Sequence, residues 1–337
     1  MARSLDEDDV RIRPGRGKSR PRSKDRPAHT EAIGGMVLTV DRGRFTVAMD
    51  DGTEIYAIKA RELGRKGIVT GDMVQIVGDT SGDTDTQGRI VRRDERSSNL
   101  RRTADDSDPV ERVIVANATQ LAIVTATTNP DPSIGLIDRA LVAAIDAGIS
   151  PILIITKSDL KSADELTATY AALGADCYVV HDRAPSAELI AALTDNLTVF
   201  IGHSGVGKST LVNVLVPGAG RSTGHVNVNT GKGRHTSTSA MALPLSNGGW
   251  IIDTPGIRSF GLAHVDFERL IHAFPELADG VVECPRACSH DEVECALDAW
   301  AQEHGITERL DSLRRLLRSA KETDKWQEQR SADERLS

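Results

Sequence analysis

The segment Gly202–Ser209 reads G-H-S-G-V-G-K-S and fits the phosphate-loop pattern G-x-x-x-x-G-K-[ST] at every position. Its glycines would let successive backbone N–H groups face phosphate oxygens, and Lys208 would reach the β- and γ-phosphates. The Ser209 hydroxyl is the expected Mg²⁺ ligand. An apolar run, Thr198–Ile201, precedes the loop and a helical run, Thr210–Val216, follows it, as this motif requires. We therefore predict a nucleoside-triphosphate site formed by Gly202, His203, Ser204, Gly205, Val206, Gly207, Lys208, Ser209 and Thr210.

A second motif for the phosphate end of the nucleotide, D-T-P-G at Asp253–Gly256, closes a short apolar run downstream. Asp253 would hold Mg²⁺, directly or through water, and the Gly256 N–H would face the γ-phosphate. Between the two motifs lies a stretch rich in Ser and Thr, in which Thr236 and Thr238 are alternative candidates for a switch threonine. The sequence does not choose between them, nor does it exclude a loop with no metal role.

The third motif, Thr156-Lys157-Ser158-Asp159, ends an apolar strand upstream of the phosphate loop and resembles the base-reading pattern N-K-x-D. A carboxylate at Asp159 can accept hydrogen bonds from guanine N1–H and the 2-amino group, whereas adenine offers neither donor. Lys157 can pack its stem over the base. Thr156 stands where the pattern has Asn, so one amide contact is lost or replaced. These residues predict selection of guanine.

The order of the motifs is unusual, because the base motif precedes the phosphate loop and D-T-P-G, whereas ordinary GTPases place it last. The same sheet can be built if the two termini of an ordinary GTPase domain are joined and the chain is opened after the D-T-P-G strand. Domain termini usually lie at the surface and often close together, which makes this possible. We predict an α/β fold, a circularly permuted P-loop GTPase domain whose D-T-P-G segment runs into a C-terminal module.

Three of the four cysteines and one histidine gather near the C-terminus, at Cys284, Cys288, His290 and Cys295. A Cys₃His set gives Zn²⁺ a closed tetrahedral shell with no open position for catalysis. We predict one structural zinc ion that staples a helical region; reduced thiols or a redox pair are the alternatives. Cys177 stands apart and is expected to be a small buried residue.

Short strands separated by turn signals occupy the region before the GTPase motifs. About five strands in so short a stretch suggest an OB-type β-barrel, with an SH3-like barrel as the alternative. We assign residues 1–32 to a basic tail, 33–97 to the barrel, 98–275 to the GTPase domain and 276–337 to a zinc-binding helical domain. The predicted barrel strands are Met36–Val40, Phe45–Met49, Glu54–Ile58 and Met73–Val77.

Beyond the barrel, residues 92–112 are dense in charge and are predicted to be a connector. The pattern then alternates between apolar strands and helices, which indicates a parallel sheet covered on both faces. Near the C-terminus, Leu297–Trp326 has leucines at helical spacing. The expected strands and helices between these regions are Gln120–Thr125, Ile134–Ala147, Pro151–Ile155, Leu166–Leu173, Ala187–Leu193 and Thr198–Ile201.

The net charge of −8 and the aromatic content of 3% argue against a general nucleic-acid binder. Yet the stretch from Arg11 to Arg26 holds eight basic residues and one acid, so it is either a solvated tail or an arm that orders on RNA. No apolar run approaches the roughly 20 residues of a membrane span, and the N-terminus lacks the apolar core of a secretory signal. We therefore expect a cytoplasmic protein that does not bind membranes.

Through its permuted motifs, its barrel and its Cys₃His cluster, the chain resembles the small ribosomal subunit biogenesis GTPase family (RsgA, also called YjeQ) over about residues 33–320. Further matching pieces are Leu211-Val212-Asn213 and Ile257–Leu262. The resemblance implies GTP hydrolysis stimulated by the small (30S) ribosomal subunit late in its maturation, rRNA binding, release after hydrolysis and a monomer that uses Mg²⁺ and zinc. The C-x₃-C spacing is one residue shorter than expected.

The same resemblance points to His264 as the catalytic residue, which would swing in when the subunit docks. Ile257 occupies the place after D-x-x-G where small GTPases often have a water-orienting Gln, so unstimulated turnover should be slow. Two other classes of function remain possible from the residues alone. One is a pure nucleotide switch, which would hydrolyse GTP only incidentally. The other is a P-loop kinase or ATPase, and Asp159 argues against it.

Overall fold

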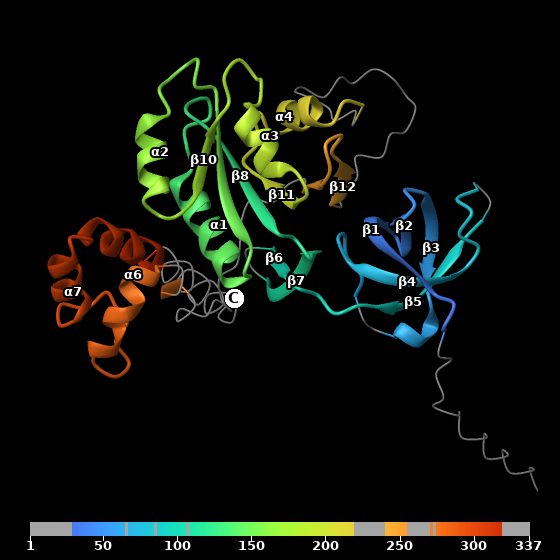
Figure 1. The fold of residues 1–337 in the computed structure, drawn as a ribbon, viewed down its shortest axis with the longest axis horizontal. Coiled ribbons are helices and arrows are strands. Elements are labelled where there is room, and N and C mark those ends of the chain that lie inside the picture. The colour runs from blue at the N-terminus through green and yellow to red at the C-terminus, as the bar shows by residue number, and fades with distance from the viewer. Residues whose placement is uncertain are drawn as a thin grey trace, which may run out of the picture. The chain divides into compact units, whose positions relative to one another are not determined.

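The structure is a computed structural model, and it describes residues 29–64, 67–83, 86–105, 108–218, 240–254, 270–271 and 274–318. The chain separates into two compact units, Met1–Thr30 and Glu31–Ser337. The predicted basic tail, with Arg11–Arg26, lies outside the described residues. The elements below all belong to the second unit (Figure 1).

The first part of this unit is a five-stranded β-barrel of the predicted OB type. Strands β1 and β2, β2 and β3, β1 and β4, and β4 and β5 pair antiparallel, and one parallel pair, β3 with β5, closes the ring. Alternate residues point inward and form a core that includes Val37, Val47, Ile76 and Ile90, each fully buried. The strands are β1 Ile33–Asp41, β2 Arg44–Met49, β3 Glu54–Lys59, β4 Met73–Gly78 and β5 Gly88–Arg93, with a 3₁₀ turn, η2, at Arg61–Leu63.

The charged stretch 92–112 is not a plain connector, and that prediction is wrong. Residues Asn99–Asp105 (β6) and Asp108–Ala116 (β7) form an antiparallel hairpin. Leu100 and Val115 point into the core while Arg101 is exposed. Leu100 and Val115 thus give the hairpin a buried apolar side, which the density of charges in the sequence hid.

The GTPase domain has a six-stranded sheet in the order β10-β9-β8-β11-β13-β12, in which only β12 runs antiparallel to its neighbour. Its strands are β8 Gln120–Ala126, β9 Ser150–Thr156, β10 Asp176–Val179, β11 Leu197–Ile201, β12 Met241–Pro244 and β13 Trp250–Asp253. The predicted strands are confirmed to within a residue or two. Strands β10 and β12 were not predicted, because they have four residues each and no long apolar run.

Helices cover both faces of this sheet, as parallel strands require. Residues with odd numbers in β8, such as Leu121 and Ile123, join the core that contains α1; their even-numbered neighbours Ala122 and Val124 join the core that contains α3 and α4. Strand β8 is thus apolar on both sides, which leaves its ends for polar chemistry. The helices are α1 Ile134–Asp146, α2 Asp164–Ala171, α3 Ala187–Leu193 and α4 Lys208–Leu215.

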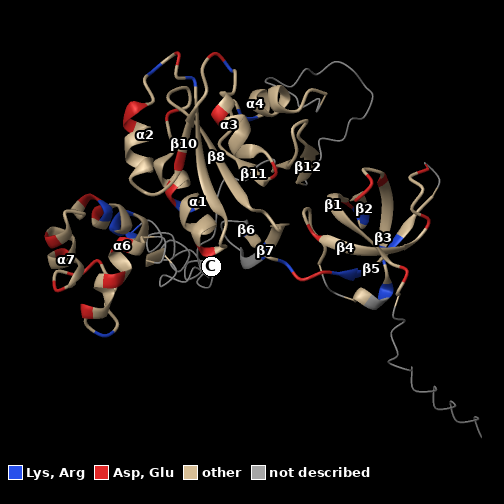
Figure 2. Cartoon of the chain, in the orientation of Figure 1, with Lys and Arg blue, Asp and Glu red and all other residues tan. Residues whose placement is uncertain are grey.

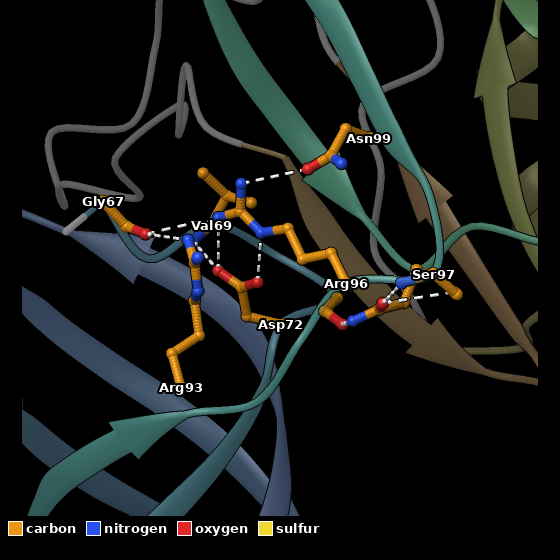
Figure 3. A network of polar contacts seen from close by, with 9 residues as sticks. Gly67, Val69, Asp72, Arg93, Arg96, Ser97 and Asn99 are labelled. Carbon is orange, nitrogen blue, oxygen red and sulfur yellow. Dashed lines mark hydrogen bonds and ion pairs between the residues drawn. The ribbon is translucent and has the colours of Figure 1, made fainter. Parts of the chain in front are cut away.

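Barrel and GTPase sheet are hydrogen-bonded into one eleven-stranded sheet, because β1 pairs with β12 at Thr39 and Met241. A second junction lies between the barrel loop before β4 and the start of the hairpin (Figure 3). There Asp72, which is fully buried, accepts hydrogen bonds from Nε and Nη2 of Arg96 at 2.6 and 2.8 Å. Arg96 also donates to Asn99 Oδ1 and Gly67 O, so one guanidinium joins barrel loop and hairpin.

The C-terminal module consists of α6 Pro275–Ala278, a 3₁₀ turn η3 at Asp279–Glu283, α7 Leu297–His304 and a further helix over residues 307–318. The helical character predicted over Leu297–Trp326 is confirmed for its described part, where two helices are separated at Gly305, which adopts φ +68° and ends α7. Residues beyond 318 lie outside the description. Among the described helices, none is long and apolar enough to cross a membrane. The leucines of the predicted stripe are buried, at Leu310, Leu313, Leu316 and Leu317.

Candidate nucleotide site and metal centre

The predicted phosphate loop lies between β11 and α4, at the carboxyl end of a parallel strand, where α/β sheets bind ligands. Gly207 caps α4 with φ +95°, a conformation that favours glycine. A Cβ on Gly202 would lie 2.4 Å from the carbonyl oxygen of Val124 in β8, so any other residue would collide with backbone. Val206 is buried beneath the loop. The loop is therefore shaped by contacts with neighbouring strands as well as by its own glycines.

Two opposite charges meet where the phosphate loop approaches the end of β13. Lys208, the first residue of α4, forms an ion pair with Asp253, and both side chains are largely buried. Thr254 is buried too, and its hydroxyl donates to Phe200 O of β11 at 2.8 Å, which fixes the turn after Asp253. The pair offers a cation for phosphate oxygens and a carboxylate for Mg²⁺ at one place.

The base motif lies at the end of β9, beside the phosphate loop. Thr156 is buried, and its hydroxyl lies 2.5 Å from Val206 O in the loop and 3.1 Å from Thr125 O in β8. Lys157 has φ +57°, and its ammonium donates to Asn129 O in the loop after β8. The structure therefore directs the Thr156 hydroxyl to the phosphate loop and not to open space for a base.

Asp159, the predicted base reader, is exposed at the same edge of the sheet. Beside it, Ser158 Oγ donates to Val180 O at 3.0 Å and lies 3.0 Å from His181 Nδ1. His181 follows β10, and because that strand was not predicted, a role for this residue was not predicted either. The signal was available: a parallel strand that neighbours β9 must end at the edge where Asp159 lies.

The structure thus brings together the phosphate loop, Asp253 and the base motif. Ser209 and Thr210 follow Lys208 in the first turn of α4, half-buried. The remaining predicted site residues, Thr236, Thr238, Gly256 and His264, lie outside the described residues, as does Ile257.

The predicted zinc ligands converge in the C-terminal module, between η3 and α7. The ligand atoms of Cys284, Cys288, His290 and Cys295 all lie within 4.8 Å of one another. Cys284 Sγ is 3.8 Å from Cys295 Sγ and 3.6 Å from His290 Nδ1. Around a tetrahedral zinc, bond lengths of about 2.3 Å to sulfur and 2.0 Å to nitrogen place such atoms about 3.8 and 3.5 Å apart. The donor set and its spacing fit zinc.

Neighbouring groups hold this cluster in shape. The His290 N–H donates to Cys288 Sγ at 3.4 Å, and Arg314 Nε donates to His290 O at 2.9 Å. Arg314 also makes a bidentate contact with Asp298 of α7, at 2.7 and 2.8 Å. Burial raises the pKa of the Cys288 and Cys295 thiols above their ordinary value, so a bound cation would have to displace their protons.

Comparison with known proteins identifies the family. A family model described as RsgA GTPase matches residues 93–263. A Pseudomonas aeruginosa protein named "Small ribosomal subunit biogenesis GTPase RsgA" is 39% identical over 269 residues, 76% of this chain and 77% of the relative. The chain belongs to the RsgA GTPase family. An RsgA protein of the same name from Chlorobaculum parvum is 34% identical over 309 residues, 87% of this chain and 99% of the relative.

Two solved structures of similar proteins agree with the fold. Thermotoga maritima YjeQ is 25% identical, with a TM-score of 0.63 over 86% of this chain and 98% of its own. YloQ, described as a circularly permuted GTPase, is 23% identical and has the same TM-score over 88% of this chain and 98% of its own. The RsgA fold, with its permuted GTPase domain, barrel and cysteine cluster, is therefore the fold of this chain.

Proposed function

We propose that this chain is a GTP hydrolase that is stimulated by the small ribosomal subunit, acts late in that subunit's maturation and is released after hydrolysis. Membership of the RsgA family is the observation that carries the proposal. The site supports it, because the phosphate loop, Asp253 and a T-K-S-D motif meet at one edge of the sheet. The partners would be the small subunit with its rRNA, and GTP or GDP.

Guanine selection would rest on Asp159, with the stem of Lys157 against the base. The Lys157 ammonium donates to Asn129 O, which holds that stem beside the loop after β8. Thr156 would contribute indirectly, because its hydroxyl holds the phosphate loop through the carbonyl oxygen of Val206. Excess unlabelled ATP should therefore fail to displace labelled GTP, and displacement by that excess of ATP would contradict the assignment.

At the phosphate end, Lys208 and the backbone N–H groups of Gly202–Ser209 would neutralise the β- and γ-phosphates. Ser209 and Asp253 would hold Mg²⁺, which supplies further positive charge to the transferred phosphoryl group. Thr236 or Thr238 would sense the γ-phosphate, Gly256 would donate its N–H to it, and His264 would orient the attacking water. Because Ile257 cannot polarise water, the unaided rate would be low.

The Cys₃His cluster would hold one structural zinc ion in a closed shell. Acidic and basic residues are interspersed over the barrel and the α6–α7 region (Figure 2), and the net charge is −8. Attraction to RNA would therefore come from local basic groups, among them those of Arg11–Arg26. We further propose a cytoplasmic monomer.

Pelleting with purified small subunits tests the release step. The protein should sediment with small subunits in the presence of a non-hydrolysable GTP analogue and stay in the supernatant with GDP. Lys208→Ala, which removes the phosphate-binding cation, serves as the control and should not respond to either nucleotide. Equal sedimentation of the wild-type protein with both nucleotides would refute release after hydrolysis.

A further inference from the structure

The base motif makes a β-turn at the end of β9, and Asp159 is the third residue of that turn. The Leu160 N–H donates to Lys157 O at 3.0 Å, which closes the turn over Ser158 and Asp159. Lys157 enters the turn with φ +57°, a left-handed conformation that residues other than glycine rarely adopt and that the surroundings must hold. The direction of the Asp159 carboxylate therefore depends on the groups that fix this turn.

Strand β8 holds the first residue of the turn through Thr127, which directly follows that strand and has 1% of its surface exposed. The Thr127 N–H donates to Thr156 O at 3.0 Å, where the pairing of β8 with β9 ends. Its hydroxyl donates to Lys157 O at 2.6 Å, the same carbonyl that closes the turn. Asn129 O accepts a hydrogen bond from the Lys157 ammonium. Lys157 is thus held from the β8 side at its carbonyl and at the end of its side chain.

Strand β10 holds the second residue of the turn through His181. Ser158 Oγ donates to Val180 O at 3.0 Å and lies 3.0 Å from His181 Nδ1. Because a carbonyl only accepts and a hydroxyl has one hydrogen, that hydrogen belongs to Val180 O, and His181 must donate to Ser158 from Nδ1. The His181 backbone is itself fixed, since the Ala184 N–H donates to His181 O at 2.8 Å. The contact therefore assigns the ring proton of His181 to Nδ1.

We infer that Thr127 and His181 are positioning residues for Asp159, through which the two strands that flank β9 set the preference for guanine. The inference rests on the proposed function, in which Asp159 accepts hydrogen bonds from guanine N1–H and the 2-amino group. Two bonds to one carboxylate require both of its oxygens in place, so they depend strongly on the orientation of the turn. Thr127 acts through Lys157 O, and His181 acts through Ser158.

The test compares binding of GDP with binding of inosine diphosphate, which lacks only the 2-amino group of guanine. The ratio of the two dissociation constants reports on recognition of the base, whereas a general loss of folded protein weakens both equally. Thr127→Val keeps the shape of the side chain and removes its hydroxyl. Loss of that hydrogen bond should lower the preference for GDP roughly three- to tenfold. Thr127→Ser keeps the hydroxyl and should retain the wild-type preference.

His181 is tested with one substitution that removes the donor and one that keeps it. His181→Ala should lower the preference for GDP by a similar factor. His181→Asn should retain it, because the amide nitrogen is bonded to Cγ, as Nδ1 is, and can donate to Ser158 Oγ. Thr198→Val is the matched control for a lost buried hydroxyl, which here donates to Gln120 Oε1 at 2.9 Å at the opposite end of the sheet. It should leave the ratio unchanged.

A double-mutant cycle checks that the effect passes through Asp159. Asp159→Ala should abolish the preference for GDP over inosine diphosphate. Addition of Thr127→Val or His181→Ala to that variant should then leave the ratio as it is. A further change in the ratio would show that the two residues act on the nucleotide by another route, and it would contradict the inference.

A wild-type preference that persists in Thr127→Val or in His181→Ala would overturn the inference. If Thr127→Val does not fold, the comparison of His181→Ala with His181→Asn decides, because His181 is exposed and its substitution leaves the core intact. A wild-type protein that binds GDP no better than inosine diphosphate would instead refute the proposed selection of guanine by Asp159.

Discussion

At the scale of single residues, the site depends on a few buried polar atoms whose partners are backbone carbonyls. The hydroxyl of Thr156 faces two of them, Val206 O and Thr125 O, with a single hydrogen to share. An Asn in its place would bring two N–H donors. Thr156 therefore links the base motif to the phosphate loop with a single side-chain hydroxyl.

Thr156→Val should lower nucleotide affinity about tenfold, because Val206 O loses its donor and the phosphate loop loses its link to β9. Thr198→Val is the matched control: its hydroxyl is equally buried and donates to Gln120 Oε1 at 2.9 Å, at the opposite end of the sheet. Both variants should lose about 1 kcal/mol of unfolding free energy. Titration with labelled GDP separates them, and equal affinities would contradict the role given to Thr156.

His264→Ala should reduce subunit-stimulated GTP turnover to the unstimulated rate while GTP binding stays intact. The reason is chemical: an imidazole can orient and polarise water, whereas Ile257 cannot. Single-turnover hydrolysis with and without small subunits measures the effect. A variant that retains full stimulation would rule out His264 as the water-orienting group.

At the scale of elements, α7 and the helix over residues 307–318 hold the Cys₃His cluster in shape through Arg314. Asp298 is half-exposed, so its ion pair with Arg314 contributes little to stability by itself. The ion pair instead orients the Arg314 guanidinium, whose Nε donates to His290 O. Groups that orient metal ligands from behind typically change metal affinity by about 10- to 100-fold.

Asp298→Asn should therefore weaken zinc binding by about tenfold, measured by competition with a chromogenic chelator. Glu303→Gln, exposed on the same helix, is the control and should leave zinc binding unchanged.

The hydrogen bond from Arg314 holds the pKa of Asp298 below its ordinary value. A lowered carboxyl pKa gives a contribution that is full above the unfolded pKa of about 3.9 and is lost only as pH falls through the native one. The difference in zinc affinity between Asp298→Asn and the wild-type protein should thus stay constant from about pH 8 to pH 5. A gap that closes within that window would show that Arg314 does not keep Asp298 ionised.

Elements and motifs differed in how far the sequence predicts them. The phosphate loop and T-K-S-D are each a continuous stretch of sequence, and β8, β9 and β11 are recognisable as apolar runs. Strands β10 and β12 have four residues each, and their formation depends on pairing with neighbouring strands. Because β10 is not recognisable in the sequence, the position of His181 beside Ser158 could not be predicted. Contacts such as Arg96 with Asp72, 24 positions apart, or Thr70 with Ala240, 170 apart, depend on tertiary placement and leave no local pattern.

At the scale of the whole molecule, the GTPase sheet continues into the barrel, and the junction carries one strongly buried ion pair. Asp72 is fully buried and the side chain of Arg96 is 10% exposed. Asp72 also accepts from the Val69 N–H at 2.8 Å, so the carboxylate organises the barrel loop as well as the junction (Figure 3).

Asp72→Ala should lower the free energy of unfolding by about 3–5 kcal/mol, because it leaves the Arg96 guanidinium buried without its counter-charge. Asp94→Ala is the control, since Asp94 pairs with Arg92 at the surface and should cost under about 1 kcal/mol. Denaturant unfolding measures both. Equal costs would mean that the junction is not held by its buried pair.

The central proposal is that the small ribosomal subunit stimulates GTP hydrolysis at this site. GTP turnover of the purified protein, with small subunits, with large subunits and alone, tests it most directly, with Lys208→Ala as the inactive control. We predict slow turnover alone and with large subunits, and a rise of at least about tenfold with small subunits, which Lys208→Ala lacks. Turnover that is the same under all three conditions would contradict the account.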